Sequence, residues 1–254
     1  MQREISQATT AIEIENLTKD YGDVRALDSL SLSISEAEVF GLLGPNGSGK
    51  TTTINCLTGI LKPTSGTVRV GGFDIQTHGR EARQIVGVSP QETAVYSYLT
   101  GKENVELFGR LYSVPKRTLG PRVDYVLERV GLRDEAGRRV GKYSGGMKRR
   151  VSIAMALVMD PKVVLFDEPT VGMDPQSRRA IWDFIAELRD GGKTIVITTH
   201  YMEEADELCD RVGVIDHGRL IALGPPADLR SAYGARNLED VFIQLTGRTI
   251  REGA

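Results

Sequence analysis

The feature that most constrains the fold of this chain is the glycine-rich stretch GPNGSGKT at residues 44–51. The stretch fits the pattern G-x-x-x-x-G-K-[ST], follows the apolar run VFGLLG and precedes the helix-like run TTTINCLTGIL. A loop of this kind joins a buried strand to a helix, and the backbone N–H groups of Gly47, Gly49 and Lys50 would surround phosphate groups at the helix N-terminus. The stretch therefore predicts an α/β fold with a phosphate-binding loop at a strand end.

Short apolar runs alternate with amphipathic stretches along the chain, which is typical of a mainly parallel sheet flanked by helices. Three of these runs are predicted to be buried strands: VFGLLG (39–44), VVLFDE (163–168) and TIVITTH (194–200). Each run leads directly into polar residues. Because ligands bind at the carboxyl ends of parallel strands, we expect the functional residues to gather there.

Two regions depart from this pattern. The runs IEIENLTKDYG, LDSLSLSI and GTVRVGGFDI alternate with period two, which predicts antiparallel strands half exposed at a sheet edge. From about residue 94 to residue 160 the apolar residues recur at helical spacing, and Thr100 and Glu103 are placed as a capping box. We therefore expect an N-terminal antiparallel β subdomain and an α-helical subdomain inserted between two core strands.

Local sequence signals predict where further helices begin or end and where a hairpin turns. Asp174 as N-cap and Pro175 at the first helical position begin a helix over DPQSRRAIWDFIAELRDGG, and Gly131 ends a helix over PRVDYVLERVGL. DHG at 216–218 is predicted to be a hairpin turn between RVGVI and RLIALG. NLEDVFIQLTGR has the pattern of an amphipathic helix, which packs either on the core of the chain or on its counterpart in a dimer.

Charge and cysteine content disfavour several classes of protein. Lys plus Arg total 32 and Asp plus Glu total 34, so the net charge of -2 gives no general attraction for nucleic acid, and we expect no nucleic-acid partner. Cys56 and Cys209 are far apart and lack ligand spacing, which indicates a reduced, cytosolic protein without zinc or disulfides. The N-terminal stretch MQREISQATT lacks the apolar core of a signal peptide, and the longest apolar runs have the length of strands, so we expect no membrane insertion.

VVLFDEP supplies the second half of a nucleoside triphosphate site. Asp167 at the strand end would hold the shell of a Mg²⁺ ion, and Glu168 beside it would polarise an attacking water. In the glycine-rich loop, the Lys50 ammonium would reach the β- and γ-phosphates and the Thr51 hydroxyl would bind Mg²⁺. The alternative interpretation of Asp167 and Glu168 is two solvated carboxylates in a loop. The sequence has no N-K-x-D element, which a GTPase would need.

Four motifs, GPNGSGKTT, YSGGMKRR, VVLFDEPTVGMD and TTHYMEEAD, occur in the order found in ABC-type ATPases. The chain resembles this family from Tyr21 to His200 by motif, and further by general likeness. The resemblance implies a P-loop NTPase core with the two subdomains described above, ATP and Mg²⁺ as ligands, and ATP hydrolysis as the activity. It also implies one ABC ATPase domain over 1–254, with the following parts: the ATP-binding core at about 11–93 and 161–220, the helical signature lobe at 94–160 and a C-terminal extension at 221–254.

The resemblance assigns roles to residues outside the glycine-rich loop. Tyr21 is similar to the aromatic residue that stacks on adenine, although a core or edge tyrosine is the alternative. Gln91 resembles the glutamine that contacts Mg²⁺ and the attacking water. Asp174 is implied as a contact across a dimer as well as a helix cap, and His200 as the donor to the γ-phosphate. The nucleotide-binding residues of the loop itself are Gly44, Pro45, Asn46, Gly47, Ser48, Gly49, Lys50, Thr51 and Thr52.

YSGGMKRR is a second anion-binding element. Ser144 lies where an N-cap is expected, so Gly145 and Gly146 would expose backbone N–H groups at a helix N-terminus. In the family this signature contacts the γ-phosphate bound by the partner subunit, which implies a head-to-tail homodimer that encloses two ATP molecules. The basic run 148–150 is interpreted as a solvated helix face; the alternatives are contacts with nucleic acid, lipid headgroups, neighbouring acidic residues or the bound phosphates.

The resemblance leaves the class of ABC protein open. Members that repair DNA carry long insertions between the motifs, and members that act on ribosomes usually have two ATPase domains, whereas this chain has neither feature. Tyr143 and Met147 depart from the commoner signature Leu-Ser-Gly-Gly-Gln. SGGMKRR, TTHYMEEAD and NLEDVFIQLTGR resemble the ATP-binding subunits of ABC-2 type exporters, which include daunorubicin-type multidrug resistance ATPases. An importer ATPase is the alternative, and a soluble non-transport ATPase is a further one.

A transport ATPase without membrane spans must act through a separate permease. We expect the permease to dock in the groove between the core and the helical lobe, near Gln91 to Leu99. The apolar residues of ETAVYSYL suit that contact, although core packing explains them equally well. The implied location is cytoplasmic, peripheral on the cytoplasmic face of the cell membrane. The residues do not indicate whether the exported substrate is a drug, a lipid or a polysaccharide.

Overall fold

The N-terminal strands form a sheet of their own. The structure is a computed structural model that describes residues 9–247. Within these residues a four-stranded antiparallel sheet has the order β2-β1-β4-β5. Its strands are β1 (Thr10–Tyr21), β2 (Val24–Ser35), β4 (Ser65–Val70) and β5 (Phe73–Asp74). The antiparallel pairing predicted from the period-two pattern is confirmed. The strands do not extend an edge of the parallel sheet, and β1 lies in the interior of their own sheet.

The second sheet contains the three predicted buried strands. Over the described part of the chain it has six strands in the order β10-β9-β3-β8-β7-β6. They are β3 (Val39–Leu43), β6 (Val86–Ser89), β7 (Val163–Asp167), β8 (Thr194–Thr199), β9 (Arg211–Asp216) and β10 (Arg219–Gly224). All pairs are parallel except β9 with β10, which form the predicted hairpin. The carboxyl ends of β3, β7 and β8 therefore meet at one edge.

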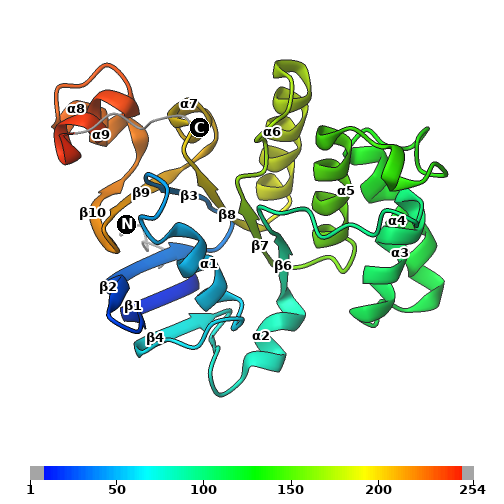
Figure 1. Ribbon diagram of the computed structural model, residues 1–254, viewed down its shortest axis with the longest axis horizontal. Helices are drawn as coiled ribbons and strands as arrows, with labels where there is room; N and C mark the ends of the chain where they lie inside the picture. Colours follow the sequence, from blue (N-terminus) through cyan, green and yellow to red (C-terminus); the bar gives the residue numbers. More distant parts are fainter. Residues whose placement is uncertain (1–8, 248–254) are drawn as a thin grey trace, which may run out of the picture.

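Helices cover the parallel sheet and build a separate lobe. They are α1 (Lys50–Leu57), α2 (Gly79–Ile85), α3 (Gly101–Leu111), α4 (Lys116–Arg129), α5 (Gly145–Leu157), α6 (Pro175–Asp190), α7 (Met202–Leu208), α8 (Pro226–Ala232) and α9 (Leu238–Thr246), with a 3₁₀ turn at Val140–Lys142. In Figure 1 the helices α3, α4 and α5 form one end of the molecule, and β1, β2 and β4 lie on the other side of β6 and β7. None of the helices within residues 9–247 combines the length and the apolar character needed to cross a bilayer.

The predicted caps are confirmed by their hydrogen bonds. The Glu103 N–H donates to Thr100 Oγ1 (3.1 Å) and the Thr100 N–H donates to Glu103 Oε2 (2.8 Å), which completes the capping box of α3. Asp174 Oδ1 accepts from the Ser177 N–H (2.9 Å) at the start of α6. Gly131 has φ of 67° just after α4, as a helix-ending glycine does. Helix α4 begins earlier than the predicted run.

Two apolar clusters bury both faces of the parallel sheet. Along β7, Val164 and Phe166 belong to the cluster shared with the helical lobe, α6 and α7, whereas Val163 and Leu165 belong to the cluster shared with the antiparallel sheet and α1. This explains why the strand sequence is apolar at every position. Helix α9 joins the first cluster through Leu238 and Val241, so it packs on the core of its own chain.

Both cysteines are buried free thiols, in agreement with the expected absence of a disulfide between them. Burial raises the pKa of the Cys56 thiol to about 11 and the pKa of Cys209 well above its usual value. Cys209 also sets a packing constraint, because its Sγ would lie 2.8 Å from a β-carbon at Gly41 of β3. The thiols therefore act as small apolar groups in the core.

The close approach of β6 to α5 allows a test of this packing. A β-carbon at Gly87 would lie 2.1 Å from the Ala156 carbonyl oxygen, so Gly87→Ala must displace α5 from β6. We expect this change to lower the free energy of unfolding by about 1–3 kcal/mol.

Gly137, an exposed turn residue of the helical lobe, is the matched control, because its φ is not positive and a β-carbon there would meet no atom within 4 Å beyond its chain neighbours. Gly137→Ala should leave the free energy of unfolding unchanged or raise it by up to about 1 kcal/mol, since alanine lowers the conformational entropy of the unfolded chain. Urea denaturation of both variants measures the two changes. Equal effects, or a reversed ranking, would contradict the packing of β6 against α5.

Candidate functional site

The glycine-rich loop connects β3 to α1 and needs glycine at specific positions. Gly49, the N-cap of α1, has φ of 112°, and a β-carbon there would lie 2.8 Å from the Ala26 carbonyl oxygen. A β-carbon at Gly44 would lie 2.2 Å from the Ile215 carbonyl oxygen. Gly47 has φ of 79°. The sequence therefore folds into a tight loop that ends at a helix N-terminus, where unpaired N–H groups attract anions.

Lys50 directs its ammonium back over this loop. Its Nζ donates hydrogen bonds to the carbonyl oxygens of Gly44 (2.7 Å) and Pro45 (3.0 Å). Burial lowers the pKa of Lys50, and the carboxylates of Glu168 and Asp167 oppose that shift. The site thus holds a buried cation beside two carboxylates, within a loop suited to phosphate groups.

Asp167 lies at the end of β7 and joins three parts of the sheet edge. Its Oδ2 accepts from the Thr51 hydroxyl of α1 at 3.3 Å, and its Oδ1 accepts from the Thr198 hydroxyl of β8. The Thr51 hydroxyl and the Asp167 carboxylate are hard oxygen ligands of the kind that Mg²⁺ prefers, and they converge beside the phosphate-binding loop. The residues present therefore fit a Mg²⁺ ion that also binds substrate phosphates.

Glu168 is the most constrained residue of the site. It follows β7 with φ of 52°, a region that costs a residue other than glycine free energy and that is often found at functional sites. Its Oε2 accepts from Gln91 Nε2 at 3.0 Å, and its Oε1 is hydrogen-bonded to His200 Nδ1 at 2.9 Å. Its N–H donates to the Thr198 carbonyl oxygen at 3.0 Å. The structure thus brings the three residues Gln91, Glu168 and His200 together from β6, β7 and β8.

The environment keeps Glu168 ionised. The hydrogen bond from His200 is the largest cause that lowers the pKa of Glu168; burial opposes it, and the charges of Lys50 and Arg149 add to the lowering. An ionised carboxylate accepts hydrogen bonds only. Near neutral pH, Glu168 can therefore accept a hydrogen bond from a water molecule and polarise it.

Not all of the sequence-predicted residues lie at this cluster. Ser144 caps α5, where its Oγ accepts from the Met147 N–H at 3.2 Å, and Gly145 and Gly146 open the same helix. Figure 1 places α5 in the helical lobe, on the other side of β6 and β7 from α1. Tyr21, at the end of β1, is 46% exposed, and Lys19 Nζ lies 5.1 Å from the centre of its ring.

The interpretation of the basic run as a solvated helix face is wrong for Arg149. This side chain is 4% exposed and donates hydrogen bonds to backbone carbonyl groups near Gln91 and Glu168. A signal was present in the sequence, because the run VSIAMALV (151–158) is apolar except for Ser152, which is typical of a helix without a solvated face. Arg150, in contrast, reaches the carbonyl oxygens of Val130 and Gly131 in the helical lobe.

A buried carboxylate behind the site was also missed. Glu204 of α7 accepts from the Thr170 hydroxyl (2.8 Å) and from Trp182 Nε1 (3.0 Å), both at its Oε1. Burial raises its pKa. Glu204 thereby links α7, which follows His200, to α6 and to the loop that follows Glu168. Its place in TTHYMEEAD gives no sign that it is buried while its neighbour Glu203 is exposed.

A family model described as "ABC transporter" matches residues 27–171. A linearmycin resistance ATP-binding protein of Bacillus subtilis is 43% identical over 95% of this chain and 76% of its own length. A daunorubicin/doxorubicin resistance ATP-binding protein of Streptomyces peucetius is 42% identical over 92% of this chain and 71% of its own length. A Nod factor export ATP-binding protein of Paraburkholderia xenovorans is 47% identical over 91% of this chain and 76% of its own length.

Solved structures agree with these relatives. The ATP-binding subunit of an ABC transporter is similar with a TM-score of 0.86 and 27% identity, over 93% of this chain and all of that chain. A dimeric ATP-binding cassette in a post-hydrolysis state with ADP and Pi is similar with a TM-score of 0.78 and 28% identity, over 84% of this chain and 98% of that chain. The family model, the relatives and the site geometry lead to one conclusion: this chain belongs to the ABC transporter family, as an ATP-binding subunit that hydrolyses ATP.

Proposed function

We propose that two copies of this chain bind and hydrolyse ATP between them and thereby power an ABC-2 type exporter. The observation that carries the proposal is the Glu168 carboxylate, which lies between Gln91 and His200 beside the phosphate-binding loop. The relatives named for resistance to linearmycin and daunorubicin, and for Nod factor export, support export as the direction of transport. A drug, a lipid or a polysaccharide is the class of substrate that we propose.

The loop 44–52 would hold the triphosphate. Its N–H groups at the start of α1 would bind phosphate oxygens, and Lys50 would exchange its two carbonyl contacts for the β- and γ-phosphates. Tyr21 would stack on the adenine, which its exposed ring allows. Thr51 and Asp167, with the Gln91 side chain, would hold Mg²⁺, which when bound supplies positive charge to the β- and γ-phosphate oxygens.

Glu168 would orient the water that attacks the γ-phosphorus atom. A bond forms from the water oxygen to phosphorus, and the bond from phosphorus to the bridging oxygen breaks, so ADP leaves with the electron pair. Glu168 accepts a hydrogen bond from the water and takes up the proton that the water releases as it attacks. Gln91 and His200 hold the two carboxylate oxygens in place, and His200 is also our candidate donor to the γ-phosphate.

The signature at the start of α5 supports the dimer. Ser144, Gly145 and Gly146 present a helix N-terminus in the helical lobe, away from the loop of the same chain. In a head-to-tail dimer this end would contact the γ-phosphate that the partner subunit holds, with Asp174 near the same interface. Each of the two ATP sites would then need both chains.

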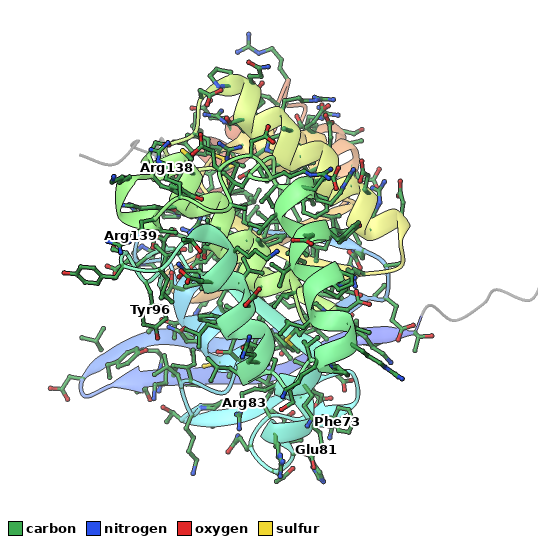
Figure 2. All side chains as sticks on the ribbon, turned by 90° about the vertical axis from the view of Figure 1, so that its right-hand side faces the viewer. Phe73, Glu81, Arg83, Tyr96, Arg138 and Arg139 are labelled. Carbon is green, nitrogen blue, oxygen red and sulfur yellow. The ribbon has the colours of Figure 1, made fainter. Side chains whose placement is uncertain are left out.

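The permease would dock in an apolar groove. A hollow of about 330 Å³ lies between the end of α1, β6 and the lobe helices α3 and α5; residues that line it include Ile60, Val88, Ala94, Phe108, Tyr112 and Met155. Tyr96 and Tyr98, on the segment that follows Gln91, are 54% and 89% exposed, which favours a contact surface over core packing. Figure 2 shows Tyr96 at the edge of the molecule, between Arg139 and Arg83.

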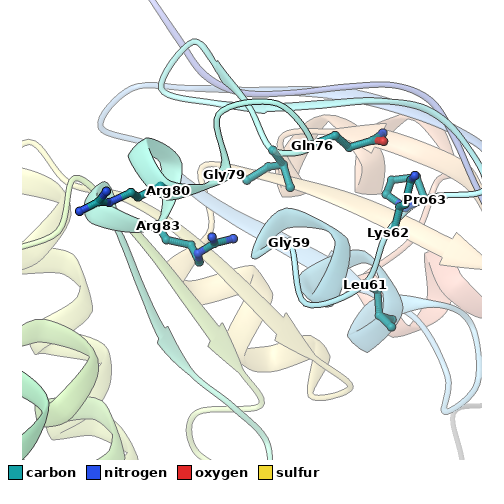
Figure 3. A pocket seen from close by; sticks show the side chains of 9 residues that line it. Gly59, Leu61, Lys62, Pro63, Gln76, Gly79, Arg80 and Arg83 are labelled. Atoms are coloured by element: carbon teal, nitrogen blue, oxygen red, sulfur yellow. The ribbon is translucent and has the colours of Figure 1, made fainter. Parts of the chain in front are cut away.

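A second hollow, next to the apolar groove, is lined by basic side chains. It has a volume of about 350 Å³, lies between the end of α1 and α2, and is lined by Lys62, Arg80 and Arg83 among others (Figure 3). Arg83 lines both hollows. We propose that this face meets the permease at the cytoplasmic side of the membrane, where the chain would be a peripheral subunit.

Ionisation of Glu168 should set the acidic limit of the ATPase activity. His200→Ala removes the hydrogen bond that lowers the pKa of Glu168, so the pKa rises and the carboxylate is protonated at a higher pH. The acidic limb of kcat should therefore move to higher pH, and kcat itself should fall. Single-turnover ATP hydrolysis across the acidic range measures both. His78→Ala, an exposed histidine next to α2, is the control, and an unmoved limb in the His200 variant contradicts the assignment.

Dimer formation should depend on ATP that is bound and not consumed. Glu168→Gln keeps the size of the side chain but removes the carboxylate, so we expect a dimer on a sizing column when ATP and Mg²⁺ are present. The double variant Ser144→Arg, Glu168→Gln places a bulky side chain at the signature and should remain monomeric. If Glu168→Gln also stays monomeric, the ATP-enclosing dimer is wrong.

Docking at the exposed tyrosines should couple hydrolysis to transport. Tyr96→Asp or Tyr98→Asp introduces a charge into the proposed contact, so transport in cells should fall while the purified subunit continues to hydrolyse ATP. Tyr125→Asp, on the exposed face of α4, is the matched control. Unchanged transport in the Tyr96 and Tyr98 variants would contradict this docking site.

A further inference from the structure

We propose that Arg149 is a positioning residue that fixes the backbone of Gln91 and Glu168 against helix α5, and so sets the geometry in which ATP is hydrolysed. The inference rests on the role proposed above for Glu168. It concerns a side chain in a run of three basic residues, for which a solvated helix face was the first of several sequence-based interpretations.

Arg149 is held by backbone oxygens of two separate loops. Its guanidinium donates hydrogen bonds to the carbonyl oxygens of Pro90, Gln91, Asp167, Glu168 and Pro169. The distances are 2.9 Å from Nη1 to Gln91, 2.6 Å from Nη2 to Glu168 and 3.2 Å from Nε to Pro169. One side chain of α5 therefore joins the segment after β6 to the segment after β7.

Only arginine can make this set of contacts. Its planar guanidinium carries five N–H donors in a fixed arrangement, whereas a lysine ammonium has three donors on a flexible chain. The group is nine-tenths or more buried, and burial lowers its pKa, while the charges of Asp167, Glu168 and Glu204 raise it. A buried charge is costly unless its donors are satisfied, so the carbonyl groups and Arg149 depend on each other.

The contacts act at Glu168, which orients the attacking water in the proposed mechanism, and at Gln91, which holds one of the Glu168 carboxylate oxygens. Glu168 has φ of 52°, and its backbone is fixed on both sides, by Thr198 at the N–H and by Arg149 at the carbonyl oxygen. Gln91 is fixed by Arg149 at its carbonyl oxygen, and its amide then reaches Glu168 Oε2 at 3.0 Å. Arg149 therefore holds the strained backbone of Glu168 in a fixed position relative to Gln91.

Arg150 provides a matched control. It is the next residue on α5, and its Nη1 donates to the carbonyl oxygens of Val130 (3.2 Å) and Gly131 (3.1 Å). These acceptors belong to the end of α4 in the helical lobe. Arg150→Gln thus removes the same kind of side chain, and the same kind of contact, from the same helix without changing the contacts at Gln91 or Glu168.

The experiment compares Arg149→Gln, Arg149→Lys and Arg150→Gln in the full chain. For Arg149→Gln we expect kcat to fall by about tenfold or more and KM for ATP to stay within about threefold. Arg149→Lys keeps the charge but loses the planar set of five donors, so kcat should fall, though less than in Arg149→Gln. Arg150→Gln should keep the kcat and KM of the wild type.

A double-mutant cycle separates this inference from the proposed function. If Arg149 acts through Glu168, Arg149→Gln should cause little further loss of activity in the Glu168→Gln background. A full further loss overturns the inference while the role of Glu168 stands. Wild-type hydrolysis by Glu168→Gln alone overturns the proposed function instead.

Arg149→Lys keeps the inference testable if Arg149→Gln does not fold, which circular dichroism will show. In that case wild-type kcat in Arg149→Lys overturns the inference. A fall in kcat with unchanged KM supports it. A parallel fall in Arg150→Gln would also overturn it, because the effect would then be a general loosening of α5.

Discussion

The pairing of β7 with β8 is the constraint on which the site depends. The two strands are parallel and in register, so that Asp167 lies opposite Thr198. Thr198 then makes two kinds of contact: its hydroxyl donates to the Asp167 carboxylate, and its carbonyl oxygen accepts from the Glu168 N–H. One threonine at a strand end thereby orients both neighbouring acidic residues. Without this pairing, the two carboxylates would not be held in position for their contacts with Thr51, Gln91 and His200.

Features that depend on near neighbours in the sequence could be predicted. The buried strands, the glycine-rich turn, the capping box at Thr100 and the caps at Ser144 and Asp174 each follow from a few adjacent residues. The antiparallel β subdomain was predicted, but its strand order, with β1 inside the sheet and not at its edge, was not. A period of two reports which face of a strand is buried and says nothing about which strands it pairs with.

The site was predictable where a motif carries the chemistry and unpredictable where a contact crosses the chain. Lys50, Asp167 and Glu168 follow from spacing, whereas Gln91 and His200 could be placed only by resemblance, because each reaches Glu168 from a different strand. No motif in the sequence marks Thr198 or Glu204 as part of the site. Arg149 was misread because charged residues are mostly exposed, and its partners are backbone carbonyl groups that no sequence pattern reveals.

The alignment of strand ends has a consequence for how the chain can change in length. Leu43 pairs with Thr199 and Asp167 with Thr198, so β3, β7 and β8 end at one level. One residue inserted into any of them would turn its side chains to the opposite face and lift its end out of the site. Insertions and deletions should therefore accumulate in the surface turns of the helical lobe, such as residues 132–139, and spare these three strands during evolution.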